Sequence, residues 1–194
     1  MTKEKIVYFI IILLVVFMGS CSIFETRTPE DPIGDSGVFV PPTTPDIVIE
    51  NLLEAFNKKN SENYYSCFSK NKFEFLPTSE ILARYPSLFQ EWNVNNEKQY
   101  IIALSTNLQN AVNPNLIFTN KEFVSLSADS AVFIADYFIK CEFIDISIPT
   151  NYQGKVNFTI KNELNSEWTI TNWKDFQNND TVNTWSYLKA LFSN

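Results

Sequence analysis

The chain has 194 residues, 45% of them hydrophobic and 15% aromatic, so it can bury a substantial core in one domain. Its formal net charge of −7 makes nucleic acid an unsuitable partner, because clustered Lys and Arg are needed to neutralise phosphates. It contains no His, which excludes Ser-His-Asp and Cys-His catalysis and most zinc sites. None of its four Gly belongs to a phosphate-binding loop, and we expect neither a cofactor nor a metal.

Residues 1–20 have the features of an export signal. Lys3 and Lys5 precede an apolar run that is shorter than the roughly 20 residues of a membrane-spanning helix. The run ends in Met18-Gly19-Ser20-Cys21, which resembles the lipobox of bacterial lipoproteins. That resemblance implies cleavage before Cys21 and attachment of lipid to Cys21, which would hold the protein on a lipid bilayer. An uncleaved N-terminal anchor is the alternative.

Residues 21–44 are predicted to form an extended tether, because Pro, Gly, Thr and acidic residues dominate them. Within the tether, Val38-Phe39-Val40 is apolar and is expected to dock on the domain that follows. Ser22 does not resemble an inner-membrane retention signal. We therefore expect a lipid-anchored protein of the bacterial cell envelope, with the outer membrane favoured.

The domain is predicted to span residues 45–194 and to open with two helices. Thr44-Pro45-Asp46 offers a capping hydroxyl, a Pro at the first helical position and an acid in the first turn. That helix is expected to end near Lys58. Ser61 is expected to cap a second, short helix.

The next segment mixes short elements with one longer helix. Residues 73–75 alternate as in a short strand, and residues 78–85 predict one or two helical turns. Asn96 and Gln99 resemble a capping box, which places a helix from Glu97 to about residue 108. Its inward face is predicted to carry four apolar residues, Tyr100, Ile101, Leu104 and Leu108.

From residue 115 the apolar period changes to two, which is typical of strands. Residues 116–118 and 122–127 predict one long or bulged strand. Residues 131–143 form the clearest strand, with Asp136 on its outer face. The inner face is predicted to carry Phe133, Ala135, Tyr137, Ile139, Cys141 and Phe143.

Two more strands and a helix complete the predicted domain. Val156, Phe158 and Ile160 share one face of a strand that a turn joins to the last strand. In that last strand Trp173 has the opposite parity to Trp168 and Ile170, and a bulge between them would return it to the same side. A C-terminal helix is suggested by Trp185, Leu188 and Leu191, with Asp180 or Thr181 as its cap.

This order of elements resembles the nuclear transport factor 2-like superfamily, also called SnoaL-like or cystatin-like α+β. Residues 43–48, 61–69 and 168–175 carry the resemblance, which covers residues 45–194. It implies an α+β fold in which a curved antiparallel sheet wraps around N-terminal helices into a cone, often with an interior pocket. The expected pocket-lining residues are Tyr64, Phe68, Phe133, Tyr137, Cys141, Trp168 and Trp173.

Three functions are open at this point. The first is a non-enzymatic domain that binds a small apolar ligand or a protein partner, and the third is a structural subunit that forms a homodimer through its sheet. The resemblance also implies a second, an isomerase or cyclase in which Asp175 is the base and Tyr137 the donor. Cys67 and Cys141 are expected either to pair as a disulfide or to remain buried and free.

Overall fold

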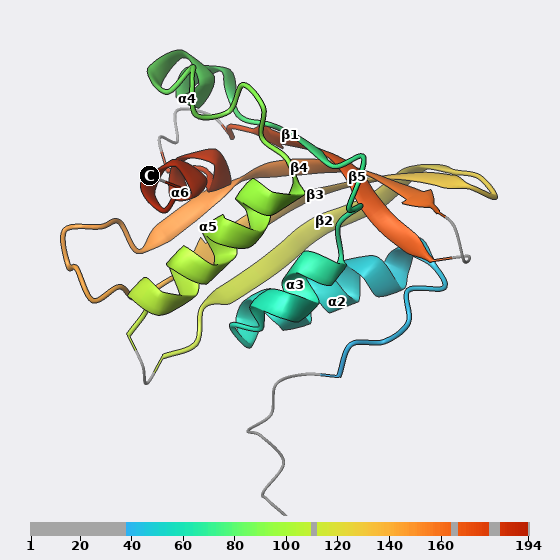
Figure 1. Cartoon of the computed structure of the whole chain (residues 1–194), viewed down its shortest axis with the longest axis horizontal. Coiled ribbons are helices and arrows are strands. Elements are labelled where there is room, and N and C mark those ends of the chain that lie inside the picture. The colour runs from blue at the N-terminus through green and yellow to red at the C-terminus, as the bar shows by residue number, and fades with distance from the viewer. Residues whose placement is uncertain (1–37, 110–111, 164–166, 179–182, 194) are drawn as a thin grey trace, which may run out of the picture. The chain divides into compact units, whose positions relative to one another are not determined.

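A computed structural model of the chain describes residues 38–109, 112–163, 167–178 and 183–193 (Figure 1). The predicted signal, Cys21 and most of the tether lie outside these residues. So do Asp180 and Thr181. The described residues belong to one compact unit, Asp35–Asn194. Across these ranges the structure contains no helix with the length and apolar character needed to cross a membrane.

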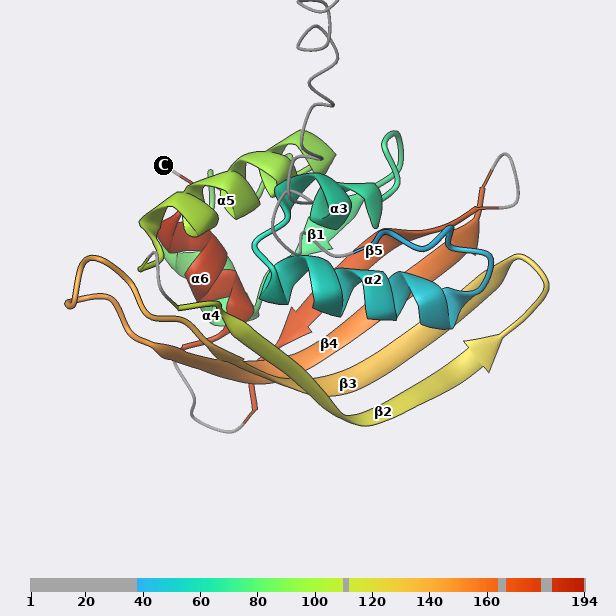
Figure 2. The same ribbon diagram turned by 90° about the horizontal axis from the view of Figure 1, so that it is seen from below.

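Five strands form one curved sheet in the order β1-β5-β4-β3-β2 (Figure 2). The elements are, in chain order, α2 (Pro45–Asn57), α3 (Ser61–Ser66), β1 (Glu74–Leu76), α4 (Ser79–Arg84), α5 (Val94–Asn107), β2 (Asn115–Leu126), β3 (Ser130–Lys140), β4 (Asn151–Asn162), β5 (Trp168–Phe176) and α6 (Trp185–Leu191). Strand β1 pairs with β5 in parallel, and the other neighbours are antiparallel. Helices α2, α3, α5 and α6 lie on one side of the sheet. The fold is therefore the expected α+β cone.

Strand parity follows the apolar pattern, including the predicted bulge in β5. Thr159 pairs with Asn172 while Ile160 pairs with Ile170, so Thr171 is the extra residue. Its hydroxyl donates to the backbone oxygen of Thr159 at 3.2 Å. Trp173 consequently returns to the inner face and is fully buried.

Three helix caps differ from the prediction. Lys59 has a left-handed backbone (φ 56°), so the extended residue that caps α3 is Asn60 and not Ser61. The capping box of α5 is made by Asn93 and Asn96, and the helix begins at Val94. The cap of α6 is Thr184, whose hydroxyl accepts from the backbone N–H three residues later.

Two further predictions needed correction at the ends of elements. Strand β3 ends at Lys140, so Cys141 and Phe143 lie beyond it, although both remain buried. Thr44 occupies the N-cap position of α2 with extended backbone, but its side chain makes no capping bond. Pro at the first helical position leaves one fewer N–H to satisfy there.

The apolar segment before α2 docks on the domain, as predicted. The side chain of Asn51 accepts from the backbone N–H of Val40 at 3.1 Å and donates to its oxygen at 2.7 Å. The backbone N–H of Trp168 donates to the oxygen of Pro42 at 2.8 Å. Phe39 packs against the core.

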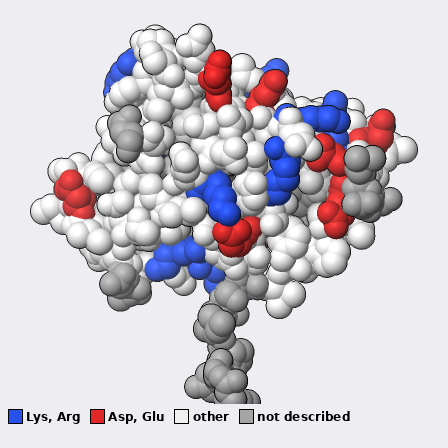
Figure 3. Space-filling view, in the orientation of Figure 1, with Lys and Arg blue, Asp and Glu red and all other residues white. Residues whose placement is uncertain are grey.

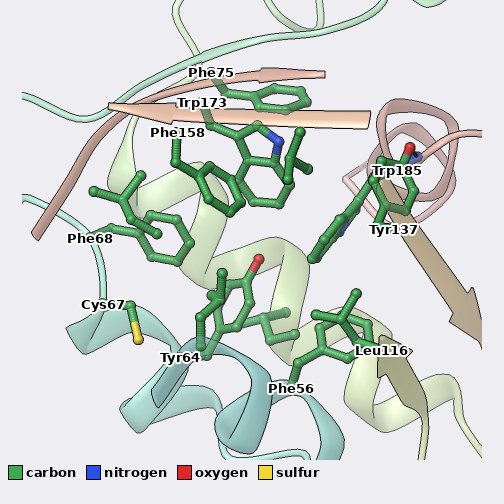
Figure 4. Packing of buried hydrophobic residues seen from close by; sticks show 14 of the residues in the cluster. Phe56, Tyr64, Cys67, Phe68, Phe75, Leu116, Tyr137, Phe158, Trp173 and Trp185 are labelled. Atoms are coloured by element: carbon green, nitrogen blue, oxygen red, sulfur yellow. Dashed lines mark hydrogen bonds between the residues drawn. The ribbon is translucent and has the colours of Figure 1, made fainter. Parts of the chain in front are cut away.

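Aromatic side chains fill the inside of the cone (Figure 4). Trp173 of β5 and Trp185 of α6 meet edge to face with ring centroids 4.5 Å apart. Phe56, Phe158 and Phe75 contact one or the other of these indoles at 5.1 to 5.5 Å. Such contacts add to the area each ring buries. The interior is a packed core around these two indoles.

Candidate functional site

A fully buried ion pair lies inside the cone. The ammonium of Lys189 on α6 lies 2.6 Å from Oε2 of Glu97 on α5, and both side chains have no exposed surface. The hydroxyl of Tyr64 donates to Oε1 of Glu97 at 2.7 Å, and Nε1 of Trp92 donates to Oε2 at 2.8 Å. A buried charge is costly unless it is paired and hydrogen-bonded, and this carboxylate meets that requirement with three donors.

The same ammonium lies in a cage of aromatic rings. Nζ of Lys189 is 3.5 Å from the ring centroid of Trp173 and 3.7 Å from that of Phe75, with Trp92 and Tyr100 at 5.5 and 5.6 Å. These distances are in the range of cation–π attraction. Burial lowers the pKa of Lys189 to about 8, while Glu97 acts in the opposite direction.

Two of these rings, Phe75 and Trp92, also line a surface hollow beside β1. It is formed by residues 73–76 and 89–93, encloses about 420 Å³ and is called the β1 hollow below. Four buried rings belong to its lining: Phe73, Phe75, Phe89 and Trp92. The exposed residues Glu74 and Glu91 add two carboxylates. The buried ion pair thus contacts two rings of the lining, and Glu97 fixes the indole of Trp92.

A second polar cluster joins the predicted pair Asp175 and Tyr137. The Tyr137 hydroxyl donates to Oδ1 of Asp175 at 2.9 Å and accepts from the backbone N–H of Trp185 at 2.6 Å. Oδ2 of Asp175 accepts from the backbone N–H and the hydroxyl of Ser186, at 2.7 and 2.5 Å. The first amides of α6, which have no partner within the helix, are thereby satisfied.

Burial raises the pKa of Asp175 to about 6, although its hydrogen bonds to Ser186 and Tyr137 act in the opposite direction. Both Asp175 and Tyr137 are buried, and neither contributes to the lining of the β1 hollow. Their contacts position them as the anchor for the first turn of α6.

Gly154 makes room for Tyr137. The two residues are cross-strand partners, and a Cβ on Gly154 would lie 2.5 Å from the Tyr137 hydroxyl and 2.5 Å from the backbone oxygen of Phe176. Glycine is therefore required by close approach. The sequence offered no sign of this role.

The predicted pocket-lining residues are parts of the packed interior. All seven are buried: Tyr64, Phe68, Phe133, Tyr137, Cys141, Trp168 and Trp173. Two of them also reach small hollows at the surface, Phe68 beside Lys70 and Phe133 beside Lys121. Cys67 and Cys141 are free and buried, which agrees with one of the two expectations for them.

Two residues of this site were not predicted from the sequence, Glu97 as a buried residue and Lys189. Glu97 precedes the inward residues Ile101 and Leu104 by four and seven positions, and Lys189 follows Trp185 by four. Both therefore lie on the inner faces of their helices. Within the described ranges no group of three or more His, Cys, Asp and Glu is placed to hold a metal.

Comparison with solved structures places the chain among proteins of the nuclear transport factor 2-like fold. A nuclear transport factor 2-like protein from Cytophaga hutchinsonii matches with a TM-score of 0.50 and 11% identity, over 68% of this chain and 93% of that one. LinA matches with a TM-score of 0.52 and 11% identity, over 68% and 81%. A candidate aromatic ring hydroxylase from Novosphingobium aromaticivorans reaches 0.54 and 12%, over 76% and 92%. At these identities the likeness establishes the fold.

No protein-family model matches the sequence, and neither does any curated protein. The chain therefore has a known architecture and a sequence that is distant from the characterised members.

Proposed function

We propose that the chain is a lipid-anchored protein of the bacterial cell envelope, held on the membrane through Cys21, whose domain binds a ligand without catalysis. The lipobox-like residues before Cys21 motivate the anchor. The absence of catalysis is supported by one observation, the filling of the cone by α6. Trp185 and Lys189 of α6 are both fully buried in the interior.

The β1 hollow is the site that we assign to the ligand. Its lining is aromatic on the inside and polar at the edge, which is the usual composition of a small-molecule site. The indole of Trp92 is held by Glu97, and Phe75 contacts both Lys189 and Trp173. A lining fixed from behind in this way binds with little loss of side-chain entropy.

One observation favours the alternative of an isomerase or cyclase. Asp175 and Tyr137 are in contact, and the pKa of Asp175 is raised to about 6, which suits a base near neutral pH. Both groups are engaged by the first turn of α6, however. Catalysis would therefore require α6 to leave the cone.

Native mass spectrometry of the full chain, released from a maltoside detergent, tests the binding role. A small molecule that co-purifies with the protein is expected, and Gln90→Trp, which fills the β1 hollow, should remove it. Gln99→Trp is the matched control, because Gln99 is an exposed residue on α5 outside the hollow. A co-purifying mass that survives Gln90→Trp, or a chain that always appears without one, would contradict binding at this hollow.

A further inference from the structure

We infer that the ligand of the β1 hollow carries a positive charge and is a small organic ammonium compound. This inference rests on the proposed function and specifies the chemical class of its ligand. It follows from the charge, the aromatic surface and the volume of the hollow.

The charge of the β1 hollow is purely negative. Glu74 and Glu91 contribute carboxylates, and none of the nine lining residues is Lys or Arg. Among the ion pairs of the described residues, neither Glu74 nor Glu91 takes part in one. Three other hollows differ in this respect, since each includes a lysine: Lys140, Lys121 and Lys70. A cation would thus meet two unpaired carboxylates and no competing amine in the lining.

Three rings of the lining contact one another, and each keeps 4–5% of its surface exposed. The ring centroids of Phe89 and Trp92 are 5.1 Å apart, and Phe75 lies 5.7 and 5.8 Å from them. The faces of aromatic rings attract cations, and ammonium compounds are commonly bound by such sets of rings near carboxylates. Phe75 and Trp92 already show this geometry toward the ammonium of Lys189 on the inner side.

The charge of Lys189 does not oppose a second cation strongly, because Glu97 neutralises it at 2.6 Å. The volume of about 420 Å³ suits a compound of a few carbon atoms up to a ring with a charged head. The neutral face of such a ligand would lie on the rings, and its head would lie near Glu74 and Glu91.

Two isosteric probes test the inference. Choline and 3,3-dimethyl-1-butanol have the same shape and differ in charge, and each is titrated into the ¹⁵N-labelled full chain in maltoside micelles. Choline is expected to shift the amide resonances of residues 73–76 and 89–93. From the strength of a cation–π contact we expect the neutral alcohol to bind at least about tenfold more weakly.

Charge variants identify the carboxylates. Loss of both charges in Glu74→Gln/Glu91→Gln is expected to weaken choline binding roughly fivefold, as suits exposed ion pairs, and to reduce its dependence on salt. Glu54→Gln is the control, since Glu54 is exposed on α2 and lines none of the hollows described.

The outcomes separate the two proposals. Equal binding of both probes in the hollow would overturn the positive charge and leave the hollow as a ligand site. Choline shifts that map to other residues would overturn the inference about this hollow. Absence of shifts with both probes, together with a co-purifying mass that Gln90→Trp removes, would also exclude the ammonium class.

Discussion

At the scale of one residue, Lys189 is a buried charge whose desolvation is offset by its neighbours. Its ammonium is fully buried, and its compensation comes from Glu97 and from the faces of Trp173 and Phe75. Nε1 of Trp173 has no hydrogen-bond partner in the described part of the chain. The indole is thus placed to offer its face to Lys189 while its N–H stays unsatisfied.

Removing Lys189 alone should be worse than removing the whole ion pair. Lys189→Met leaves the carboxylate of Glu97 buried without its cation, and we expect a loss of about 3–5 kcal/mol in the free energy of unfolding. Glu97→Gln/Lys189→Met should recover most of that loss, because no uncompensated charge remains. Urea unfolding of the three proteins measures this. Equal destabilisation by the single and double variants would show that packing, and not charge, sets the cost.

The pKa of Asp175 predicts a dependence of stability on pH. Since burial raises that pKa from 3.8 to about 6, the folded protein holds the proton more tightly than the unfolded chain. The contribution of Asp175 to stability is therefore full below pH 3.8 and is lost as the pH rises to about 6. The stability advantage of the wild type over Asp175→Asn should shrink across this window in urea unfolding at several pH values.

Asp145→Asn serves as the control for Asp175→Asn. The exposed Asp145 has a lowered pKa because it accepts from the backbone N–H of Ser147, so its contribution changes with pH in the opposite sense. A wild-type advantage over Asp175→Asn that grows with pH would show that the hydrogen bonds from α6 outweigh burial.

The small size of Gly154 leaves room for the Tyr137 hydroxyl, and that hydroxyl anchors the first turn of α6. In Gly154→Ala the new methyl group would displace the Tyr137 hydroxyl, which then loses Asp175 and the backbone N–H of Trp185. We expect a destabilisation of about 1–3 kcal/mol, as is usual for overpacking. Thermal unfolding monitored by circular dichroism measures it.

A second variant separates the hydroxyl from the backbone at Gly154. In the Tyr137→Phe background the hydroxyl is absent, so the added cost of Gly154→Ala should be smaller. An undiminished cost would locate the clash at the backbone oxygen of Phe176.

At the scale of elements, the strands with a regular alternation of apolar and polar residues could be predicted from the sequence. The alternation in β3 and β4 and the parity break around Thr171 could be read because every second side chain faces the core. The pairing of β1 with β5 could not, since Glu74 and Asn172 lie far apart in the chain and a three-residue strand carries little pattern. The β1 hollow depends on that pairing, so it could not be predicted from the sequence either.

For the whole molecule, we expect lipid on Cys21 to hold the protein on the membrane. Cys21→Ser should abolish incorporation of radiolabelled palmitate and move the protein from the membrane fraction to the soluble fraction. Cys141→Ala is the control, because its thiol is buried and its pKa is raised to about 12 by burial. Membrane association that persists in Cys21→Ser without lipid would favour an uncleaved N-terminal anchor.

The homodimer that we predict from the sequence would use the outer face of the sheet. Ile117 and Phe138 are cross-strand partners there and keep 43% and 39% of their surface exposed. Figure 3, in the orientation of Figure 1, shows the side of the molecule that carries the helices, and Lys, Arg, Asp and Glu side chains are interspersed there. Sedimentation of the wild type should show a dimer that Phe138→Lys dissociates. A wild type that stays monomeric at high concentration would refute this pairing.

The two hydrogen bonds between the Asn51 side chain and the Val40 backbone bear on how the chain responds to a pulling force. A pull on the chain ahead of residue 38 is borne first by the two Asn51 bonds and by the bond from Trp168 to Pro42. When these hydrogen bonds break, residues 38–43 can straighten and add at most about 20 Å to the length of the predicted tether, at the usual reach of an extended chain. The load then arrives at α2, whose apolar side is buried in the core. We therefore expect these six residues to detach from the domain before tension on the predicted tether can unfold it.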